Sequence, residues 1–474
     1  MARTIDFGID LGTTNSAIGK FVKGDVRVFK NPSGHKETVP SAVMFRKNRI
    51  MVGDNAKTRL QKAPEQVVAG FKRKMGTTEA YSVEGREEPV TPVELSTHVL
   101  KELTDWVRTT TEEEVDSAVI TIPASFDAQQ CEATKKAGKE AGLAHVLLLQ
   151  EPIAASLAYA NEQTEHDFED GQWLVYDLGG GTFDVALVSA EEGELTVIDH
   201  EGDNYLGGTD FDDFIVQELL VPHLSSNYRL ENLEELTRES SRHIKLYYYL
   251  REEAERAKIR LSSRTSAEPL FVIEDDDGVG HDVDLTITRS DFEDLIRDKV
   301  NETVEMVNTV LTQNSLVPSD IDCVLMVGGS TYIPYVRRQI REALEVPVLC
   351  DIDPTTAVAR GAAHFAGSRK IEGKDEEAEE KKEADLSVKT SYESACQDTE
   401  VLWAAKVEGD IEGCRYRIVR QDGGFDTGWK PLEEKVFEDL PLVEDAHNSF
   451  DFSVRDENNN VLSTDAEEIE VTQG

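Results

Sequence analysis

Short apolar runs alternate with amphipathic stretches through about residue 369 of the chain. The apolar runs predict buried strands, and the stretches between them, where apolar residues recur every three or four positions, predict helices. The clearest strand-like runs are Ile5–Ile9, Val115–Ile122, Trp173–Tyr176 and Cys323–Val327. This alternation predicts an α/β domain over residues 1–369.

Three of these runs end in glycine-bearing turns. The first continues into Asp10-Leu11-Gly12-Thr13-Thr14, the third into Asp177-Leu178-Gly179-Gly180-Gly181-Thr182, and the fourth into Gly328-Gly329-Ser330. Such turns expose backbone N–H groups that can converge on an anion. Between the strands, Thr91-Pro92-Val93-Glu94 predicts a helix start with a capping box and a proline at the first helical position.

The composition changes abruptly near residue 370. Residues 370–388 are acidic and poor in apolar side chains, which predicts a solvated linker. Short strand-like runs separated by turns follow in 389–474, and no lid helices are visible there. We therefore predict three parts: an α/β domain (1–369), a linker (370–388) and a small β-sandwich-like domain (389–474).

The charge balance limits the classes of partner. The chain has 93 acidic and 50 basic residues, a net charge of −43, which argues against nucleic acid and against an anionic membrane surface. The acidity serves solubility, or it recruits a basic partner. Five scattered cysteines without a CxxC pair indicate neither a disulfide framework nor a zinc site. Without a signal peptide or a long apolar run, a cytoplasmic protein is expected.

The two aspartate-led turns carry the strongest chemical indication. A GxxxxGK[ST] phosphate loop is absent, but two such turns facing each other would hold a polyphosphate from both sides and leave two carboxylates near its magnesium ion. A single turn of this kind could equally be an ordinary turn at the end of a strand. Two of them, about 165 residues apart and each following an apolar run, favour a nucleotide site.

Further motifs resemble those of the DnaK-type heat-shock chaperones, in the family's order over about 1–369. Besides the two turns they are Glu151–Tyr159 (EPIAASLAY), Leu206–Asp212 (LGGTDFD), Glu255–Lys258 (ERAK) and Val327–Thr331 (VGGST). Actin and the sugar kinases share the two turns but not the whole set. The resemblance implies a two-lobed, actin-like ATPase domain that takes ATP or ADP with Mg²⁺, and K⁺ is a further candidate ion.

The resemblance also implies residues that act near the reacting phosphate. Lys72 would orient the attacking water and meet developing charge, although a solvated surface lysine is the plainer interpretation. Glu151 would link the lobes near the magnesium shell, and Asp184 would help to polarise water. Thr182 would lie beside the γ-phosphate, unless it only caps its turn.

The remaining implied residues hold the metal and the nucleotide. Asp10 and Asp177 would bind the waters around magnesium. Glu255 and Lys258 would hold the ribose and adenine, although they also fit an ordinary exposed helix pair. The implied nucleotide contacts are Gly12, Thr13, Thr14, Gly179, Gly180, Gly181, Thr182, Gly207, Gly208, Glu255, Lys258, Ser262, Gly328, Gly329, Ser330 and Tyr332.

This chain also departs from the family pattern. The family stacks arginines on the adenine, whereas Ile259 and Tyr332 stand at the matching positions and would sandwich the base between an aliphatic and an aromatic face. Cys131 replaces the arginine that follows the switch proline, here Pro123, and is more readily a small packed residue than a reactive thiol. The linker and the β-domain replace the family's peptide-binding half.

Four functions remain open on these grounds. The first is an ATP-driven, chaperone-like switch whose β-domain binds a protein client, with a J-domain helper and a nucleotide-exchange factor as candidate partners. The second is a nucleotide-dependent scaffold or sensor for one dedicated partner. A filament-forming ATPase is disfavoured because the motifs are chaperone-like and the chain is acidic. A small-molecule kinase lacks a visible substrate motif.

Overall fold

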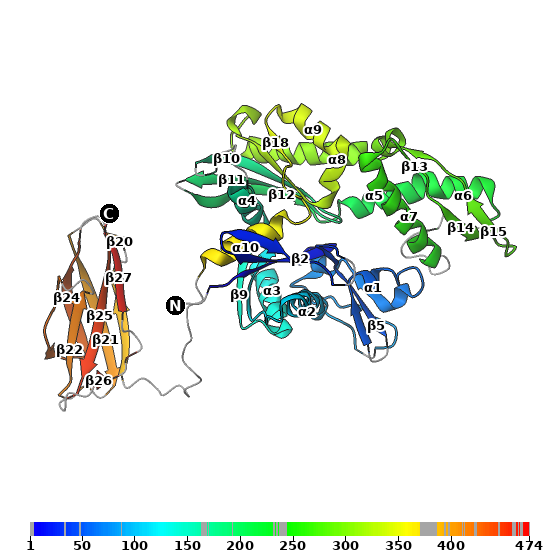
Figure 1. Ribbon diagram of the computed structural model, residues 1–474. Helices are drawn as coiled ribbons and strands as arrows, with labels where there is room; N and C mark the ends of the chain where they lie inside the picture. The colour runs from blue at the N-terminus through cyan, green and yellow to red at the C-terminus, as the bar shows by residue number, and fades with distance from the viewer. Residues whose placement is uncertain are drawn as a thin grey trace. The chain divides into compact units, whose positions relative to one another are not determined.

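The computed structural model shows two compact units, Met1–Glu372 and Gly373–Gly474. It describes residues 4–369 and 386–473 apart from short gaps at 33–34, 47–48, 87, 163–167, 169, 192, 231–232, 234–235, 237–243, 393–394, 397–398, 410, 412, 421–423, 444–445, 457–460, 463 and 465–467. Most of the predicted linker, 370–385, therefore lies outside the described residues. Figure 1 labels the elements of both units.

The first unit contains two lobes, each built on a central sheet of the same topology. The first sheet has the order β3-β2-β1-β8-β9, with β1–β2 and β2–β3 antiparallel and β1–β8 and β8–β9 parallel. Strand β4 (Val39–Pro40) adds a short pairing to β2. The bounds are β1 Phe7–Asp10, β2 Asn15–Val22, β3 Asp25–Val28, β8 Ser117–Ile122 and β9 His145–Gln150.

The second sheet repeats this arrangement in the order β12-β11-β10-β17-β18. Its first three strands pair antiparallel and its last two join in parallel, as in the first sheet. The bounds are β10 Gly171–Leu178, β11 Phe183–Glu191, β12 Glu194–Asp203, β17 Val324–Val327 and β18 Val348–Leu349. The hairpins β1–β2 and β10–β11 are therefore equivalent, and each carries one aspartate-led turn.

Helices α4 (Glu151–Glu162) and α10 (Ala357–Ser368) pack between the two sheets (Figure 1). Their contact is unusually close, because a Cβ on Gly361 would lie 1.6 Å from the carbonyl oxygen of Ala154. One hydrophobic cluster includes Val119 of the first sheet, Val175 of the second and Ala362 of α10. The two lobes thus share a continuous core along this seam.

Each lobe also has a peripheral part beyond its central sheet. In the first lobe this part has the small sheet β6-β5-β7 and helix α1 (Asp54–Lys57), and α2 (Pro92–Thr111) and α3 (Ala128–Ala141) cover the lobe. The strands are β5 Ala42–Arg46, β6 Arg49–Val52 and β7 Val67–Ala69. The start of α2 differs from prediction. Thr91 Oγ1 accepts from Glu94 N at 3.2 Å, but the Glu94 carboxylate binds Arg86 at 2.7 Å instead of closing the capping box.

The peripheral part of the second lobe is mostly helical. It contains the long helix α7 (Ile244–Ser263) and two small pairings, β13–β16 and β14–β15, whereas the long helix α8 (Arg289–Gln313) packs against β11 and β12 of the central sheet. The other elements are α5 Gly208–Ile215, α6 Val221–Asn227, α9 Pro334–Leu344, β13 Ser266–Ala267, β14 Phe271–Glu274, β15 Gly280–Val283 and β16 Ile287–Thr288. None of the described helices has the length and apolar character needed to cross a membrane.

The second unit is a β-sandwich, as expected. One sheet has the order β19-β21-β24 and the other β20-β27-β25-β22-β23, with β26 paired to β25. Inward-facing Trp403, Ile418 and Phe450 are fully buried in its core. The bounds are β19 Leu386–Ser391, β20 Ala395–Cys396, β21 Glu400–Gly409, β22 Arg415–Arg420, β23 Lys430–Pro431, β24 Lys435–Pro441, β25 Ala446–Arg455, β26 Val461–Leu462 and β27 Glu468–Gln473. Strand β19 begins slightly before residue 389, where we placed the start of this domain.

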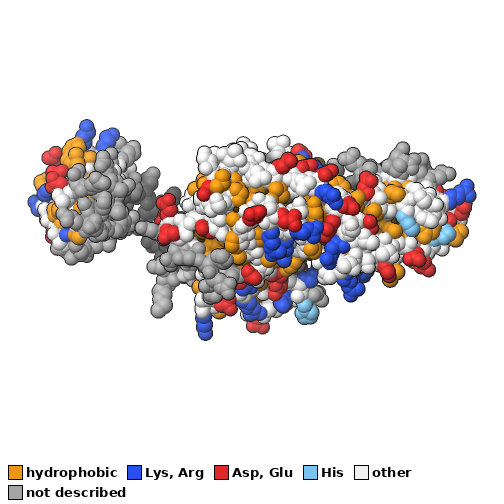
Figure 2. Space-filling model, turned by 90° about the horizontal axis from the view of Figure 1, so that it is seen from above, with side chains coloured by type: hydrophobic (Ala, Val, Ile, Leu, Met, Phe, Trp, Pro, Cys, Tyr) orange, Lys and Arg blue, Asp and Glu red, His pale blue; other side chains and the backbone are white. Residues whose placement is uncertain are grey.

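One face of the larger unit carries charges of both signs (Figure 2). Figure 2 shows acidic and basic side chains interspersed along the face in view instead of separated into large patches of one sign. The excess of acidic residues is therefore not concentrated on this face. A surface of this kind favours solubility over a single strong electrostatic docking patch.

Candidate functional site

The two aspartate-led turns meet between the lobes. Gly179 N donates to the carbonyl of Thr182 at 3.0 Å, which closes the second turn. The first turn lies directly against it, since a Cβ on Gly180 would sit 2.6 Å from Thr14 Oγ1. Only glycine permits this approach, and it leaves backbone N–H groups of both turns at the same place.

Two further glycine-bearing turns support the second one. Gly208 N donates to the Gly179 carbonyl at 3.1 Å, and Thr209 N donates to the Gly180 carbonyl at 2.7 Å. Ser330 Oγ donates to the same Gly179 carbonyl at 2.8 Å. The turn after β17 and the start of α5 therefore hold the Gly179–Thr182 turn in a fixed shape.

A cavity of about 530 Å³ opens over these turns. Its size suits a ligand as large as a nucleotide, since small-molecule sites span roughly 300–1,000 Å³. It brings together residues from both lobes that are far apart in the sequence. The sequence-predicted residues that line it are Asp10, Gly12, Thr13, Thr14, Lys72, Glu151, Asp177, Gly179, Gly180, Thr182, Gly208, Glu255, Lys258, Ser262, Gly328, Gly329, Ser330 and Tyr332.

Three predicted residues do not line this cavity. Asp184 lies behind its wall, beside a much smaller pocket that also contacts Glu151, Asp177 and His200. Gly181 and Gly207 pack against each other, and a Cβ on Gly207 would lie 2.4 Å from Gly181 N. Their predicted contacts with a nucleotide stay predictions. Both glycines support the turn that does line the cavity.

Lys72 is not the solvated surface lysine that the plainer interpretation allowed. Its side chain is 4% exposed, and its Nζ lies 2.6 Å from Glu151 Oε1, whose side chain is 14% exposed. Lys72 belongs to the 3₁₀ turn Phe71–Lys74, and Glu151 begins α4. The neighbouring Lys74 is instead exposed and pairs with Glu79 at 2.8 Å. The turn therefore points the side chain of Lys72 inward and that of Lys74 towards solvent.

Several carboxylates lie around the ammonium group of Lys72, and they shift one another's pKa. Burial, with the negative charge of Glu151 as the next cause, raises the pKa of Asp10 to about 7 and that of Asp184 to about 8. The same two causes raise the pKa of Asp177 well above its usual range. Thr121 Oγ1 donates to Asp10 at 3.2 Å and offsets this only in part. The floor of the cavity therefore has an unmet demand for positive charge.

This demand fits a magnesium ion held through water. Among the described residues no group of three or more His, Cys, Asp or Glu is arranged to hold a metal ion directly. Mg²⁺ keeps several waters and binds through one or two carboxylates together with substrate phosphates. Asp10 and Asp177, from the two equivalent strand ends, fit that second mode, because both line the cavity beside the two phosphate-type turns.

The opposite end of the cavity is more open. Ile259 on α7 is 62% exposed and Tyr332 is 43% exposed, and both line the cavity. Tyr332 Oη donates to Asp353 Oδ1 at 3.0 Å, and the guanidinium of Arg337 lies 5.4 Å from the centre of its ring. These two contacts fix the tyrosine ring, so a flat ligand group can stack on it.

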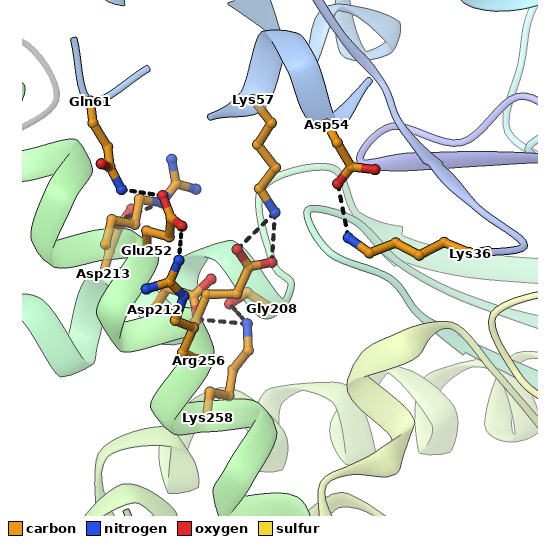
Figure 3. A network of polar contacts seen from close by, with 12 residues as sticks. Lys36, Asp54, Lys57, Gln61, Gly208, Asp212, Asp213, Glu252, Arg256 and Lys258 are labelled. Carbon is orange, nitrogen blue, oxygen red and sulfur yellow. Dashed lines mark hydrogen bonds and ion pairs between the residues drawn. The ribbon is translucent and has the colours of Figure 1, made fainter. Parts of the chain in front are cut away.

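Glu255 and Lys258 do not form the exposed helix pair that we considered. Lys258 Nζ lies 2.7 Å from the buried Asp212 and also donates to the Gly208 carbonyl. Glu255 instead binds Lys57 of α1 at 2.7 Å, across the cleft between the lobes. Figure 3 shows both contacts beside a second bridge, from Gln61 to Glu252.

Sequence reasoning missed Lys57, Asp212 and Arg73. Asp212 ends the LGGTDFD motif, and Lys258 ends the ERAK motif. Their opposite charges could have suggested that these two motif residues pair. Arg73 follows Lys72 and donates to the Gly181 carbonyl in the other lobe. Lys57 lies outside the recognised motifs, and its partner Glu255 is 198 residues further along the chain. The residues around Lys57 therefore give no signal for this ion pair.

The comparison with known protein families adds the deciding observation: the family described as Hsp70 protein matches residues 6–379. The chain belongs to the Hsp70 family. Among Hsp70 relatives, the chaperone protein DnaK of Mycoplasma mobile is 37% identical over 366 residues, covering 77% of this chain and 58% of the relative. DnaK of Mesomycoplasma hyopneumoniae (strain 7448) is 39% identical over 377 residues, covering 77% and 59%.

The Hsp70 match explains the larger unit only. The chain spans less than two thirds of the length of these curated relatives. The predicted resemblance and the predicted fold class, an actin-like ATPase fold followed by a β-rich part, are both confirmed. The β-sandwich from Leu386 onward lies beyond the residues that the Hsp70 family matches.

Proposed function

We propose that this Hsp70-family chain binds ATP or ADP with Mg²⁺ in the cavity between its lobes and hydrolyses ATP slowly. One observation carries the proposal: two equivalent hairpin turns meet over a buried cluster of carboxylates. Such a floor repels a bare polyphosphate and accepts one that arrives with a divalent cation. The bound ion would neutralise charge that develops on the phosphates.

Different residues of the chain would have different roles in binding and hydrolysis. Backbone N–H groups of Thr13, Thr14 and the Gly179–Thr182 turn would hold the phosphates. Lys72 would orient the attacking water, and its pairing with Glu151 keeps its ammonium group inside the cavity. Asp184, which contacts the smaller pocket behind the wall, would act on this water from that side. Contacts that bridge the cleft, such as Lys57 with Glu255, would slow product release.

We further propose that nucleotide state controls binding of a protein client to the β-sandwich. The two DnaK relatives bear the name chaperone protein, and lobe closure is a common way to transmit nucleotide state. A J-domain helper and a nucleotide-exchange factor are candidate partners on the same grounds. A cytoplasmic location fits this function.

A dedicated scaffold or sensor is the second candidate function. It is favoured by one feature: among the described residues the second unit contains only strands, so nothing there encloses a peptide as a lid would. In this case the sandwich would dock one folded partner, and the ATPase unit would set when it does so.

Two measurements test these functions in sequence. Calorimetric titration of the full chain with ATP and ADP in magnesium buffer should show binding heat, and its absence would overturn the nucleotide proposal. Suppression of light scattering by an unfolding client protein, with and without ATP, then separates the two candidates. Protection that depends on ATP supports the chaperone-like switch. ATP turnover without protection supports the scaffold.

A further inference from the structure

Strand β24 forms one edge of the β-sandwich. In the sheet β19-β21-β24 it pairs with β21, and within the described part of the chain no strand pairs with its outer side. Its side chains alternate, with Val436 and Leu440 buried and Lys435, Phe437 and Asp439 exposed. Edge strands of this length are templates for pairing with another strand.

The inward-facing charge on this strand does not prevent such pairing. Glu438 lies on the core side, where an unmatched charge would disfavour an added strand. Here it accepts hydrogen bonds from Tyr416 Oη and from Lys430 Nζ, the latter at 2.6 Å. Its charge is therefore satisfied within its own unit, and the backbone edge of β24 remains open.

The exposed residues of β24 are complementary to themselves. When two copies pair antiparallel with Phe437 opposite Phe437, Lys435 of each copy faces Asp439 of the other. Shifting the centre to Glu438 places two glutamates face to face, and shifting it to Val436 places Glu434 opposite Glu438. Directly opposed charges of opposite sign stabilise an antiparallel pair and like charges destabilise it. Of these three registers, the charge pattern therefore favours the one centred on Phe437.

Exposed apolar side chains support the same register. Phe437 is 62% exposed and Leu402 on the neighbouring strand is 58% exposed. Ala404 lies opposite Phe437 and Leu402 opposite Asp439, so the two large side chains are diagonal neighbours on the outer face. A two-fold axis through Phe437 joins these side chains from both copies into one apolar strip. Contacts of this kind are the stabilising unit of a sheet.

We infer that the β-sandwich of one chain pairs with that of a second copy through β24, which joins two three-stranded sheets into one continuous sheet. The interface is isologous, as in most homodimers. The net charge of −43 on each chain opposes association, so the dimer is weak and is strengthened by added salt, which screens that repulsion. The inference does not depend on nucleotide binding.

The test uses sedimentation equilibrium of the full chain carrying charge exchanges. Lys435→Asp or Asp439→Lys alone places like charges across the axis twice and should weaken dimerisation by about tenfold or more. An equimolar mixture of the two single variants should form heterodimers, because every opposed pair is again of opposite charge. Lys406→Asp, which makes the same charge change on β21, should leave dimerisation near the wild-type level. Circular dichroism checks that each variant folds.

Three outcomes would overturn the inference. The first is a wild-type chain that stays monomeric at about 0.5 mM, a concentration at which a weak specific dimer still forms. The second is a pair of single variants that associate as strongly as the wild type. The third is an equimolar mixture of the two variants that stays monomeric. ATP turnover measured on the same samples is expected to be unchanged. A failure of this inference is therefore distinguishable from a failure of the proposed ATPase function.

Discussion

The two ends of the central cavity are built on different principles. At the phosphate end, glycine turns pack at distances that exclude any side chain, and Lys72 is buried with a cluster of carboxylates. At the base end, Ile259 and Tyr332 are partly exposed and offer only surfaces on which a flat group can stack. The comparison teaches that chemistry at one end needs fixed geometry, while recognition at the other tolerates substitution. Substitutions at the two ends should therefore differ in size and in kind.

The largest effect is expected from Lys72→Ala. Removing the buried ammonium group takes away the residue that we propose to orient the attacking water and to meet developing charge, which should lower turnover by roughly 10²-fold or more. ATP affinity should change little, because backbone N–H groups hold the phosphates. Single-turnover hydrolysis and calorimetry measure the two effects separately. Lys74→Ala is the matched control, since Lys74 is exposed and pairs with Glu79. Retained turnover would place the water-positioning role elsewhere.

Asp10→Asn should weaken the magnesium dependence of ATP binding by about 10- to 100-fold, the range for loss of a group that supports a metal shell. The asparagine keeps the shape of the side chain and its contact with Thr121 but removes the charge. Titration of ATP binding against Mg²⁺ concentration measures the shift. An unchanged magnesium dependence would contradict the role given to Asp10.

At the base end, Tyr332→Ala should reduce nucleotide affinity by about tenfold, as expected for loss of one stacked aromatic face. Turnover at saturating ATP should remain near wild type, which is the contrast with Lys72→Ala. Tyr332→Phe is the matched control, because it keeps the ring and removes only the hydrogen bond to Asp353. Equal losses in both variants would assign the effect to the hydroxyl group instead of the ring.

The buried carboxylates predict a pH dependence of the ligand-free protein. The pKa of Asp184 is raised to about 8 in the folded state. At pH values between the usual pKa of an aspartate and about 8, the folded state therefore binds more protons than the unfolded state. Stability is therefore lost as the pH rises through this window. Asp184→Asn should raise the melting temperature by a few degrees at pH 8.5 and by less at pH 5.5. The opposite trend would show that Asp184 is charged when the site holds no ligand.

The smallest effect is expected from Lys57→Ala. This substitution removes a half-exposed bridge between the lobes and should speed nucleotide release up to about fivefold, in line with the modest strength of exposed ion pairs. Lys36→Ala is the matched control, because Lys36 pairs with Asp54 within one lobe (Figure 3). Stopped-flow release of a fluorescent nucleotide measures both. Equal rates in the two variants would show that the bridge does not limit opening.

The sequence predicted the fold class and most lining residues because the decisive signals are local. Each aspartate-led turn directly follows an apolar run, so its position at a strand end can be inferred from neighbouring residues. Contacts between distant segments could not be inferred in this way. Lys57 meets Glu255 only after both lobes have formed, and Asp184 comes to lie directly opposite Asp177 only through the register in which β11 pairs with β10.

The β-sandwich shows the same limit in another form. The alternating pattern predicted its strands, but the first three residues of β19 were assigned to the linker because the acidic run before them dominated the local composition. The pairing of β24 with β21, which leaves β24 at the edge, depends on the order of strands in the sheet. Strand order is a non-local property that no short window of residues encodes.

The tight seam between α4 and α10 has a mechanical consequence for the larger unit. Because Gly361 and Ala154 leave no space between the two helices, sliding at this contact would force backbone atoms to overlap, and we expect the halves of this unit to move by rotating about that line. A small rotation at such a pivot becomes a large displacement at the far tips, where α1 and α7 meet. A single added methyl group at position 361 would therefore act as a wedge, and it would alter the resting angle of both arms without touching any ligand.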